Sequence, residues 1–417
     1  MSGDRKSVLV LGAGAQGNVV ATLLARAGDV GSIVLADYDL ARADETAASI
    51  ASPRLRTTRA DVTDVDGTAA LMRAGGFDLV VNVAPPQFIP QAMRAALRAE
   101  RNYLDLSSVA LYEIDGLAYE QMQDAAAWEA SGRLALINAG SAPGLTNLMA
   151  REAADRFDTV DRIAIKDYAL TECAEYLPLW ILSVYAIDCA TEPWIWEDGR
   201  PKKMPIFSGE EIYDFPPPIG RPGKVYLHAH EEPVSIPLHL GKPVRYCDYK
   251  IGEPDIDAWR FLVERLRLMS EEPIDLGGGT RVRPRDLLLK VLPPTPSPQR
   301  VQRLVAEGRL SGRSMQTCDV TGTKDGRAVA LRLWVDGPDL VEASRIVPGA
   351  SDISLATSAP AAVFSLMILR GQIERRGVVL PESLDSATRA LLLEGIAEVG
   401  IEIRRRALPV GPGAGAA

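Results

Sequence analysis

The first hydrophobic positions of the chain follow a strand–helix–strand pattern. Residues 8–11 are a run of Val and Leu, which is typical of a parallel strand buried on both faces. Apolar residues then recur at steps of three and four across residues 20–27, as on one face of a helix that packs against a sheet. A second apolar strand over residues 32–36 ends at Asp37.

The same alternation continues for about 140 residues. We predict helices over 40–51, 63–75 and 89–101, and strands over 54–61, 77–83, 102–107 and 134–138. Strands that alternate with amphipathic helices predict an α/β fold with a Rossmann-type, doubly wound parallel sheet.

Beyond residue 160 the pattern changes to Trp- and Tyr-bearing β segments separated by proline-rich turns such as residues 216–218. We predict a second, α+β domain with a mostly antiparallel sheet, a helix over 284–291, and a strongly apolar, buried helix over 360–369.

Three glycines stand between the first strand and the first helix. Gly12, Gly14 and Gly17 have the G-x-G-x-x-G spacing, in which the first makes the tight turn, the second lets a pyrophosphate approach the backbone, and the third allows close helix–strand packing. The helix N-terminus adds N–H donors for phosphate. In this context the motif predicts a dinucleotide-binding loop; the alternative is a strand–turn–helix without a ligand.

Asp37 bears on which cofactor binds. A carboxylate at the end of the second strand can accept both hydroxyls of the adenosine ribose and would repel a 2′-phosphate. NAD is therefore favoured, and Arg42 or Arg59 keeps NADP possible.

Further cofactor contacts are expected where other parallel strands end. Asp61 is expected beside the adenine. The 84–86 segment is either a rigid close-approach loop or an ordinary turn. The full set of predicted cofactor-binding residues is Gly12, Ala13, Gly14, Ala15, Gln16, Gly17, Asp37, Tyr38, Asp61, Val62, Ala84, Pro85 and Ser107.

Composition limits the function classes. The chain has 417 residues, enough for two domains, with 47% hydrophobic and 24% charged residues, as in soluble globular proteins. Its net charge of −9 argues against nucleic-acid or anionic-membrane partners. The N-terminus lacks a secretory pattern, and the apolar run near 177–187 is too short to span a bilayer. We expect a cytoplasmic protein.

The cysteines and histidines predict neither disulfides nor a metal. Four scattered cysteines without a C-x-x-C pair indicate reduced thiols. His228 and His230 lie next to Glu231. On a strand, the two imidazoles would share a face and Glu231 would point the other way, so we predict no metal site.

Several short motifs together resemble the saccharopine dehydrogenase-like family, which includes saccharopine reductases, carboxynorspermidine dehydrogenases and lysine 6-dehydrogenase. The resemblance covers nearly the whole chain. It rests on Gly-Ala-Gly-Ala-Gln-Gly at 12–17, Asn-Val-Ala-Pro at 82–85, Asn-Tyr-Leu-Asp-Leu-Ser at 102–107, Gly-Ser-Ala-Pro-Gly-Leu-Thr-Asn at 140–147, Asp-Phe-Pro at 214–216, Tyr-Leu-His-Ala-His-Glu-Glu-Pro at 226–233, Ala-Pro-Ala-Ala-Val at 359–363 and Gly-Val-Val-Leu-Pro-Glu at 377–382.

The resemblance implies an N-terminal dinucleotide domain, a second domain that closes over the substrate and often dimerises, and a C-terminal helix that returns to the first. We accordingly expect residues 1–140 as the Rossmann domain, 141–350 as the α+β substrate-binding and dimerisation domain, 351–400 as the returning helical segment, and 401–417 as a tail with a disordered end. A homodimer is expected.

Family chemistry is hydride transfer at a C–N bond and needs a group to move the amine proton. Saccharopine reductases carry an acid in the glycine–proline turn, where this chain has Ala142, so the proton-transfer group is left open. The catalytic candidates are Tyr103, Glu172 and Glu231, and the substrate candidates are Tyr168, Glu175, Tyr176 and His230. The alternative for each is a structural or solvated side chain.

The leading functional hypothesis is an NAD(P)-dependent oxidoreductase acting on the CH–NH group of an amino acid or polyamine-like substrate, by imine reduction or amine oxidation. The alternatives are a deaminating, lysine 6-type amino-acid dehydrogenase and a non-catalytic NAD(P)-binding scaffold or sensor.

Overall fold

The computed structural model describes residues 5–108 and 120–410. The chain divides into two compact units. Unit 1 comprises Met1–Arg151, Ser297–Gly308 and Gly337–Ile403, and unit 2 comprises Glu152–Pro296, Arg309–Asp336 and Arg404–Ala417. Unit 1 therefore extends past residue 140, and the chain returns to it before residue 351.

Unit 1 is built on a seven-stranded sheet in the order β17-β6-β5-β4-β1-β2-β3, and every pairing in it is parallel. The strands are β1 (Lys6–Leu11), β2 (Val30–Asp37), β3 (Leu55–Arg59), β4 (Leu79–Asn82), β5 (Asn102–Asp105), β6 (Leu134–Leu136) and β17 (Gly377–Val379). The strand order reverses between β1 and β4, the switch point at which doubly wound folds bind ligands. The predicted Rossmann-type sheet is confirmed.

Unit 1 also contains helices, and those predicted over 40–51, 63–75, 89–101 and 360–369 are among them. They are α1 (Ala15–Arg26), α2 (Leu40–Ile50), α3 (Val65–Gly75), α4 (Ile89–Arg98), α5 (Ala125–Ser131), α6 (Leu145–Ala154), α11 (Pro298–Ala306), α12 (Leu340–Ile346), α13 (Asp352–Leu369) and α14 (Ser386–Ala397), with short turns η1 (Pro86–Phe88), η2 (Glu120–Met122) and η4 (Pro381–Ser383). Both alternating sets of β1 side chains from Val8 to Leu11 are at most 1% exposed, which confirms a strand buried on both faces.

Helix α13 is longer than predicted. Its N-cap is Ser351, whose side chain accepts from the Ser354 N–H in a capping box, and Pro360 lies inside it. By length and composition it is the one helix of the described chain that could cross a membrane, but 78% of it is buried. It packs against α1 and α14, so it serves as a core helix of unit 1.

Unit 2 is built on a nine-stranded sheet whose main path is β10-β11-β12-β7-β15-β16-β18, with β8 and β9 attached through β12. Its strands are β7 (Thr159–Cys173), β8 (Trp194–Glu197), β9 (Arg200–Lys203), β10 (Glu211–Asp214), β11 (Pro222–Leu227), β12 (Val244–Gly252), β15 (Leu310–Lys324), β16 (Arg327–Asp336) and β18 (Glu402–Ala407). The β12–β7 pairing is parallel, whereas β15 pairs antiparallel with both β7 and β16. The sheet is mixed but mostly antiparallel, as predicted.

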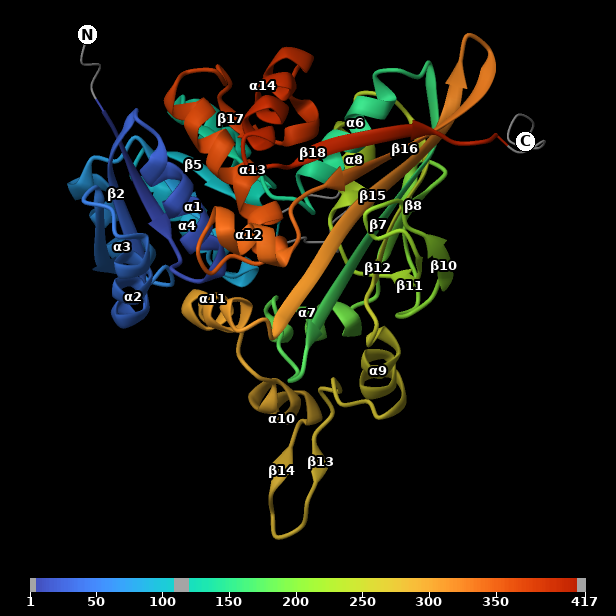
Figure 1. Ribbon diagram of the computed structural model, residues 1–417, viewed down its shortest axis with the longest axis horizontal. Helices are drawn as coiled ribbons and strands as arrows, with labels where there is room; N and C mark the ends of the chain where they lie inside the picture. Colours follow the sequence, from blue (N-terminus) through green and yellow to red (C-terminus); the bar gives the residue numbers. More distant parts are fainter. Residues whose placement is uncertain (1–4, 109–119, 411–417) are drawn as a thin grey trace. The chain divides into compact units, whose positions relative to one another are not determined.

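The remaining elements of unit 2 are α7 (Leu182–Ala190), α8 (Glu232–His239), α9 (Ile256–Arg260), η3 (Phe261–Arg265), α10 (Pro284–Val291) and the hairpin β13 (Ile274–Asp275)–β14 (Arg281–Val282), visible in Figure 1. The four cysteines are free thiols, as predicted. One prediction for the C-terminus is wrong: residues 402–407 form strand β18 rather than a tail. The predicted disorder of residues 411–417 lies outside the described residues.

Candidate functional site

The glycine loop after β1 has the geometry that a dinucleotide requires. Gly12 has φ +106°, and a Cβ on it would lie 3.0 Å from the Val83 carbonyl oxygen. A Cβ on Gly17 would lie 1.9 Å from the Gly12 oxygen, whereas a Cβ on Gly14 would meet nothing within 4 Å. Gly12 and Gly17 are therefore required by the fold, while Gly14 leaves open space above the backbone, where a pyrophosphate can approach.

Helix α1 presents its N-terminus next to this open space. Its N-cap is Gly14, and within the described chain no side chain caps it. The first N–H groups of a helix lack partners inside the helix and bind anions well. Helix α13 steadies this end, because the Ser358 hydroxyl donates to the Gln16 side-chain oxygen. The loop and helix end thus fit the phosphates of NAD(P).

Asp37 at the end of β2 is 7% exposed and already binds the backbone. Its Oδ2 accepts from the Ala13 N–H at 2.8 Å, and its Oδ1 accepts from the Asp39 N–H at 3.0 Å. A carboxylate oxygen can accept more than one hydrogen bond, so Asp37 can still bind a ribose.

Two arginines lie around Asp37. Arg42 Nη1 is 3.9 Å from Asp37 Oδ1, and the Arg42 guanidinium lies 5.5 Å from the centre of the exposed Tyr38 ring. Arg59 Nε donates to the Tyr38 carbonyl at 3.2 Å. These positive charges can also receive a 2′-phosphate, so the loop accommodates NAD or NADP.

The other predicted cofactor residues follow the ends of strands in the same sheet. Asp61 is exposed and accepts from the N–H and hydroxyl of Thr63, and these hydrogen bonds lower its pKa. Val62 packs against the hydrophobic core. Ala84 donates to the Asn82 side-chain oxygen at 3.2 Å.

Pro85 and Ser107 follow β4 and β5. Pro85 is the N-cap of η1, and the Ser107 carbonyl accepts from the Gln121 side chain at 2.9 Å. Because the carboxyl ends of parallel strands meet at one edge of a sheet, these segments share the edge that carries the glycine loop.

Tyr103 occupies a core position. It lies on β5, is fully buried, and its ring centre is 6.2 Å from that of Trp128. Its hydroxyl accepts from Asn82 Nδ2 at 3.0 Å. Burial, with the Asp105 charge adding to it, raises the pKa of Tyr103 well above its usual value. This placement favours the structural alternative, in which Tyr103 supports the loop after β4.

The turn that carries Ala142 is held by its neighbours. A Cβ on Gly144 would lie 2.0 Å from the Gly140 oxygen, and the Gly144 N–H donates to Asn147 Oδ1 at 2.9 Å. Asn147 Nδ2 donates to the buried Glu382 at 3.0 Å. The motifs at 140–147 and 377–382 therefore form one hydrogen-bonded network.

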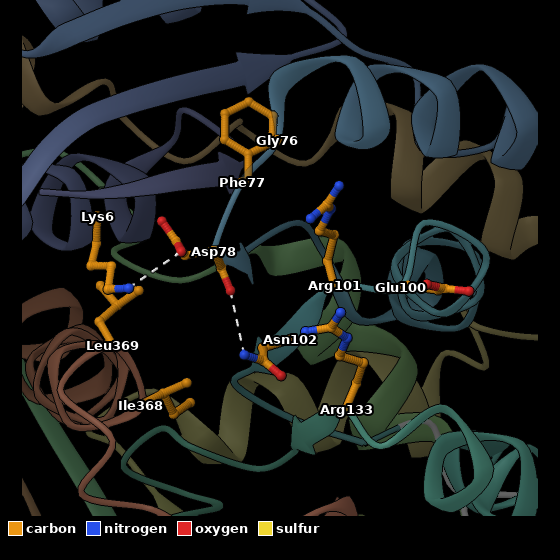
Figure 2. Close-up of a pocket in the computed structure, with 10 residues that line it drawn as sticks. All are labelled: Lys6, Gly76, Phe77, Asp78, Glu100, Arg101, Asn102, Arg133, Ile368 and Leu369. Atoms are coloured by element: carbon orange, nitrogen blue, oxygen red, sulfur yellow. Dashed lines mark hydrogen bonds and ion pairs between the residues drawn. The ribbon is translucent and has the colours of Figure 1, made fainter. Parts of the chain in front are cut away.

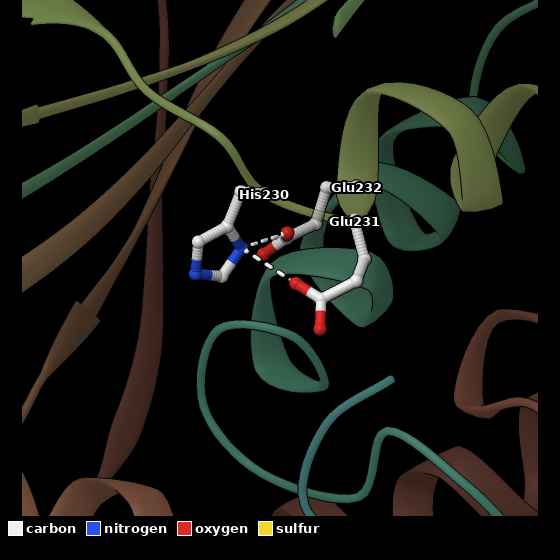
Figure 3. Close-up of side chains that lie close together, drawn as sticks. All are labelled: His230, Glu231 and Glu232. Carbon is white, nitrogen blue, oxygen red and sulfur yellow. Dashed lines mark hydrogen bonds and ion pairs between the residues drawn. The ribbon is translucent and has the colours of Figure 1, made fainter. Parts of the chain in front are cut away.

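Unit 2 contains a buried polar cluster centred on His230, which we call the His230 cluster: His230, Glu231, Glu232, Asp167, Asp188, Tyr249 and Gln316. His230 Nδ1 is within 3.2 Å of Glu231 Oε2 and forms a shorter contact with Glu232 Oε2. Figure 3 shows both carboxylates turned toward this nitrogen, while Nε2 points away from them. The side chains of His230, Glu231 and Glu232 are 19%, 11% and 0% exposed.

The expectation that Glu231 points away from His230 is wrong. Strand β11 ends at Leu227, and Glu232 begins helix α8, so the strand alternation does not apply. One ligand atom from each of His230, Glu231 and Glu232 lies within 4.8 Å of the others, a spacing that a metal ion would also accept. The absence of a metal stays a prediction.

The rest of the cluster surrounds the imidazole. The His230 ring stacks on Tyr249 of β12 at 4.0 Å. The Tyr249 hydroxyl and Gln316 Nε2 each donate to Asp167 at 3.1 Å. These contacts join β7, β12, β15 and the segment before α8 into one site.

Burial and charge set the protonation of this cluster. Burial raises the pKa of Asp167 to about 6 and that of Asp188 to about 7. Burial lowers the pKa of His230, but the adjacent Glu232 and Glu231 outweigh it and raise that pKa above its usual value. An imidazolium held by two carboxylates, with two further carboxyl groups that titrate near neutrality, is suited to binding a cationic amine and moving a proton.

Sequence reasoning named His230 and Glu231, and the structure brings them together. It named Glu172, Glu175 and Tyr176 as well, but these are exposed beyond Asp167 on the same stretch of chain. Glu172 accepts from the Ser311 hydroxyl at 3.1 Å and lies about 16 Å along β7 from Asp167, at 3.3 Å per residue.

Tyr168 is also away from the cluster. It is 6% exposed and its ring centre is 4.8 Å from that of Phe215 in a hydrophobic core. Asp167, Asp188, Glu232 and Gln316 were not selected. Asp167 is next to Tyr168 in the sequence, so its side chain points to the opposite face of β7. Strand alternation could therefore have indicated Asp167 if the other face of this strand had been considered.

Comparison with known proteins matches two consecutive parts of the chain to family models. Residues 8–136 match the family model of the saccharopine dehydrogenase NADP binding domain, and residues 140–401 match that of the saccharopine dehydrogenase C-terminal domain. Carboxyaminopropylagmatine dehydrogenase of Synechocystis sp. is 28% identical over 381 residues, covering 91% of this chain and 92% of that protein. Carboxynorspermidine synthase of Vibrio alginolyticus is 27% identical over 413 residues, covering 95% and 96%.

Solved structures share the architecture. Saccharopine dehydrogenase (L-Glu forming) from Saccharomyces cerevisiae superposes with a TM-score of 0.66 at 16% identity, covering 97% of this chain and all of that one. Homospermidine synthase from Legionella pneumophila, solved with NAD, gives 0.65 at 12% identity, covering 97% and 91%. These similarities concern the fold.

Proposed function

Because this chain belongs to the saccharopine dehydrogenase family and is an NAD(P)-binding oxidoreductase, we propose that it transfers a hydride at the CH–NH bond of an amino acid or polyamine-like substrate. The observation that carries this proposal is the His230 cluster, in which carboxylates and an imidazole are buried together. Relatives named for carboxynorspermidine and carboxyaminopropylagmatine support a substrate that carries amines.

The proposed reaction is the reversible reduction of an imine to a secondary amine. A bound nicotinamide dinucleotide supplies or takes up the hydride. The substrate carbon gains that hydride and the substrate nitrogen gains a proton, and oxidation runs the same steps backwards. The protein must therefore bind a cationic nitrogen and exchange one proton with it.

Glu231 and His230 take these roles in our proposal. Glu231 is more accessible than Glu232, so we assign it the charge of the substrate nitrogen. His230 Nδ1 is held by the carboxylates, and Nε2, which points away from them in Figure 3, exchanges the proton. Asp167 fixes the stacking partner Tyr249 by a hydrogen bond of 3.1 Å, which orients the imidazole.

The first experiment measures oxidation of NADH and NADPH by the purified chain with diamines and agmatine, each paired with an amino-acid semialdehyde. We expect turnover only when the amine and the carbonyl compound are both present. Release of ammonia from a single amine would instead identify a deaminating dehydrogenase. Cofactor binding without turnover on any pair would contradict the proposal and favour a scaffold.

The second experiment assigns the residues. Glu231→Gln should raise KM for the amine about tenfold to a hundredfold, because a charge-assisted hydrogen bond is lost. His230→Gln should lower kcat by about 10²–10⁴ and remove a limb of the pH profile. Glu272→Gln, at an exposed carboxylate, is the control that should change neither. If all three variants had equal effects, we would conclude that the His230 cluster has no role in the reaction.

We also propose a homodimer in the cytoplasm. Exposed apolar side chains on the β13–β14 hairpin and α10 support an association surface: Ile274, Leu276, Leu287 and Val291 are 50%, 62%, 58% and 65% exposed. Four free thiols suit a reducing compartment. Sedimentation velocity on the purified chain tests the dimer.

A further inference from the structure

A second polar pocket lies in unit 1 at the opposite edge of the parallel sheet. Lys6 begins β1, Asp78 precedes β4, Asn102 begins β5 and Arg133 precedes β6, and all four line the pocket together with Arg101. These positions are at the amino ends of the strands, whereas the glycine loop follows the carboxyl end of β1. We call it the amino-edge pocket (Figure 2).

Asp78, a carboxylate that lines the pocket beside Lys6, already has partners. Asp78 Oδ2 accepts from the backbone N–H of Ser7 at 2.8 Å and from its hydroxyl at 3.2 Å. Asp78 Oδ1 lies 3.6 Å from Lys6 Nζ. Lys6 and Asp78 therefore largely neutralise each other.

The two arginines have no such partner. Within the described chain, neither the Arg101 nor the Arg133 side chain forms a hydrogen bond or ion pair, and Arg101 Nε is buried without a partner. Figure 2 shows both guanidinium groups on one side of the pocket, with Lys6 across from them and the Glu100 side chain extending away. A buried, unpaired cationic donor is costly, and an anion would relieve that cost.

Their positions are set by the backbone rather than by side-chain pairing. Helix α4 ends at Arg98, Glu100 then has φ +53°, and the Arg101 N–H donates to the Ala96 carbonyl at 3.0 Å. The Arg133 carbonyl accepts from the Gly377 N–H at 2.8 Å, which ties it to β17. The backbone at both arginines is thus fixed before any ligand arrives, and both side chains line the same pocket.

We propose that the amino-edge pocket binds a small oxyanion, a phosphate or carboxylate group, between Arg101 and Arg133. The planar guanidinium fork matches both groups with paired hydrogen bonds. The pocket volume of about 160 Å³ is below that of sites for drug-sized molecules, so it suits an ion or a single head group. This site is separate from the dinucleotide loop and does not depend on the proposed function.

The test titrates the purified chain, saturated with NAD(P) to occupy the dinucleotide loop, with inorganic phosphate and with succinate at constant ionic strength. Calorimetry should show saturable binding and thermal unfolding should shift upward. Phosphate alone would indicate a phosphoryl ligand, succinate alone a carboxylate ligand, and both an oxyanion of either kind. No binding of either, or the same shift with chloride, would overturn the proposal.

Variants locate the site. Arg101→Gln and Arg133→Gln should each weaken binding about tenfold to a hundredfold. Arg98→Gln is the matched control, because Arg98 is the last residue of α4, three residues before Arg101, but is 53% exposed and pairs with Asp66. Arg101→Lys keeps the charge and should bind with intermediate affinity, which guards against a misfolded glutamine variant. Unchanged affinity in both glutamine variants would exclude this pocket.

Discussion

The carboxylate of Asp37 is bound to the backbone whether or not a ribose reaches it. Its hydrogen bonds to Ala13 and Asp39 join β2 to the glycine loop. The spacing from the glycines indicates a ribose ligand, but the same side chain also holds the loop that carries the phosphates. A single carboxylate can therefore contribute to stability and to cofactor choice.

We expect Asp37→Ala to weaken NAD binding while the chain still folds. The lost acceptors should lower the free energy of unfolding by about 1–3 kcal/mol, and NADP affinity should fall less than NAD affinity because a like-charge repulsion is removed. Calorimetric titration with both cofactors measures the ratio. Asp39→Ala, which removes only the cap of α2, should leave the ratio unchanged. If Asp37→Ala bound NAD with unaltered affinity, Asp37 would not be a ligand of the ribose.

At the scale of one element, helix α1 shows that three similar glycines have different roles. Gly17 is required by contact with the Gly12 carbonyl, whereas Gly14 faces open space. A sequence motif cannot separate these cases, because all three positions are simply glycine. The packing of α1 against β1 separates them.

Alanine substitutions should therefore have opposite consequences. Gly17→Ala should destabilise the fold by about 1–3 kcal/mol or more, because the added Cβ overlaps a backbone oxygen. Gly14→Ala should change stability by less than about 1 kcal/mol, since its φ of −77° suits alanine, yet should weaken NAD(P) binding. Urea unfolding and cofactor titration measure the two effects. Full NAD(P) affinity in Gly14→Ala would argue against a pyrophosphate at this loop.

Element prediction worked where the pattern is local. Helix α10 and strands β1 to β6 follow from periodicity and turn residues, whereas β17 was not predicted. Helix α13 begins before its apolar run because the capping box at Ser351 sets its start. The orientation of Glu231 was mispredicted for the same reason: it depends on where β11 stops. Hydrogen bonds decide where a helix or strand begins and ends, and the pattern of hydrophobic residues does not indicate those hydrogen bonds.

At the scale of the whole molecule, the chain passes between the units five times. Helices α11 and α12 pack together, and Gln299 of α11 donates to the Glu45 carbonyl at 3.2 Å, which places residues 297–308 in unit 1. The expected domain division contains the return of residues 351–400 but misses the return at Ser297–Gly308, because that segment is short.

Two buried carboxyl groups and a buried histidine make opposite contributions to stability between about pH 4 and pH 7. Burial lowers the pKa of His228 to about 3, so the His228 contribution rises with pH, whereas the contribution of Asp167 and Asp188 falls. Asp167 and Asp188 keep their protons in the folded state up to pKa values of about 6 and about 7, while the unfolded chain releases them near 4. Folding then binds protons, so higher pH disfavours it. The raised pKa of His230 acts above about pH 6.5, and there too its stabilisation is lost as pH rises.

Asp188→Asn should remove one falling contribution, so that between about pH 4 and pH 7 the free energy of unfolding changes by roughly 1–3 kcal/mol in the positive direction relative to wild type. The free energy of unfolding from urea titrations at several pH values measures it. Glu272→Gln, at an exposed carboxylate, should retain the wild-type slope. A slope equal to wild type in Asp188→Asn would show that this carboxyl group does not hold its proton in the folded state.

Local order along the chain was enough to predict the nucleotide loop and the parallel sheet, because strand burial, helix periodicity and glycine spacing act over a few neighbouring residues. The His230 cluster and the amino-edge pocket were not predictable in this way. Asp167, Asp188, His230 and Gln316 come from distant segments, and so do Arg101 and Arg133. Whether such charges are buried, paired or left without partners depends on which strands become neighbours, and that follows from long-range packing.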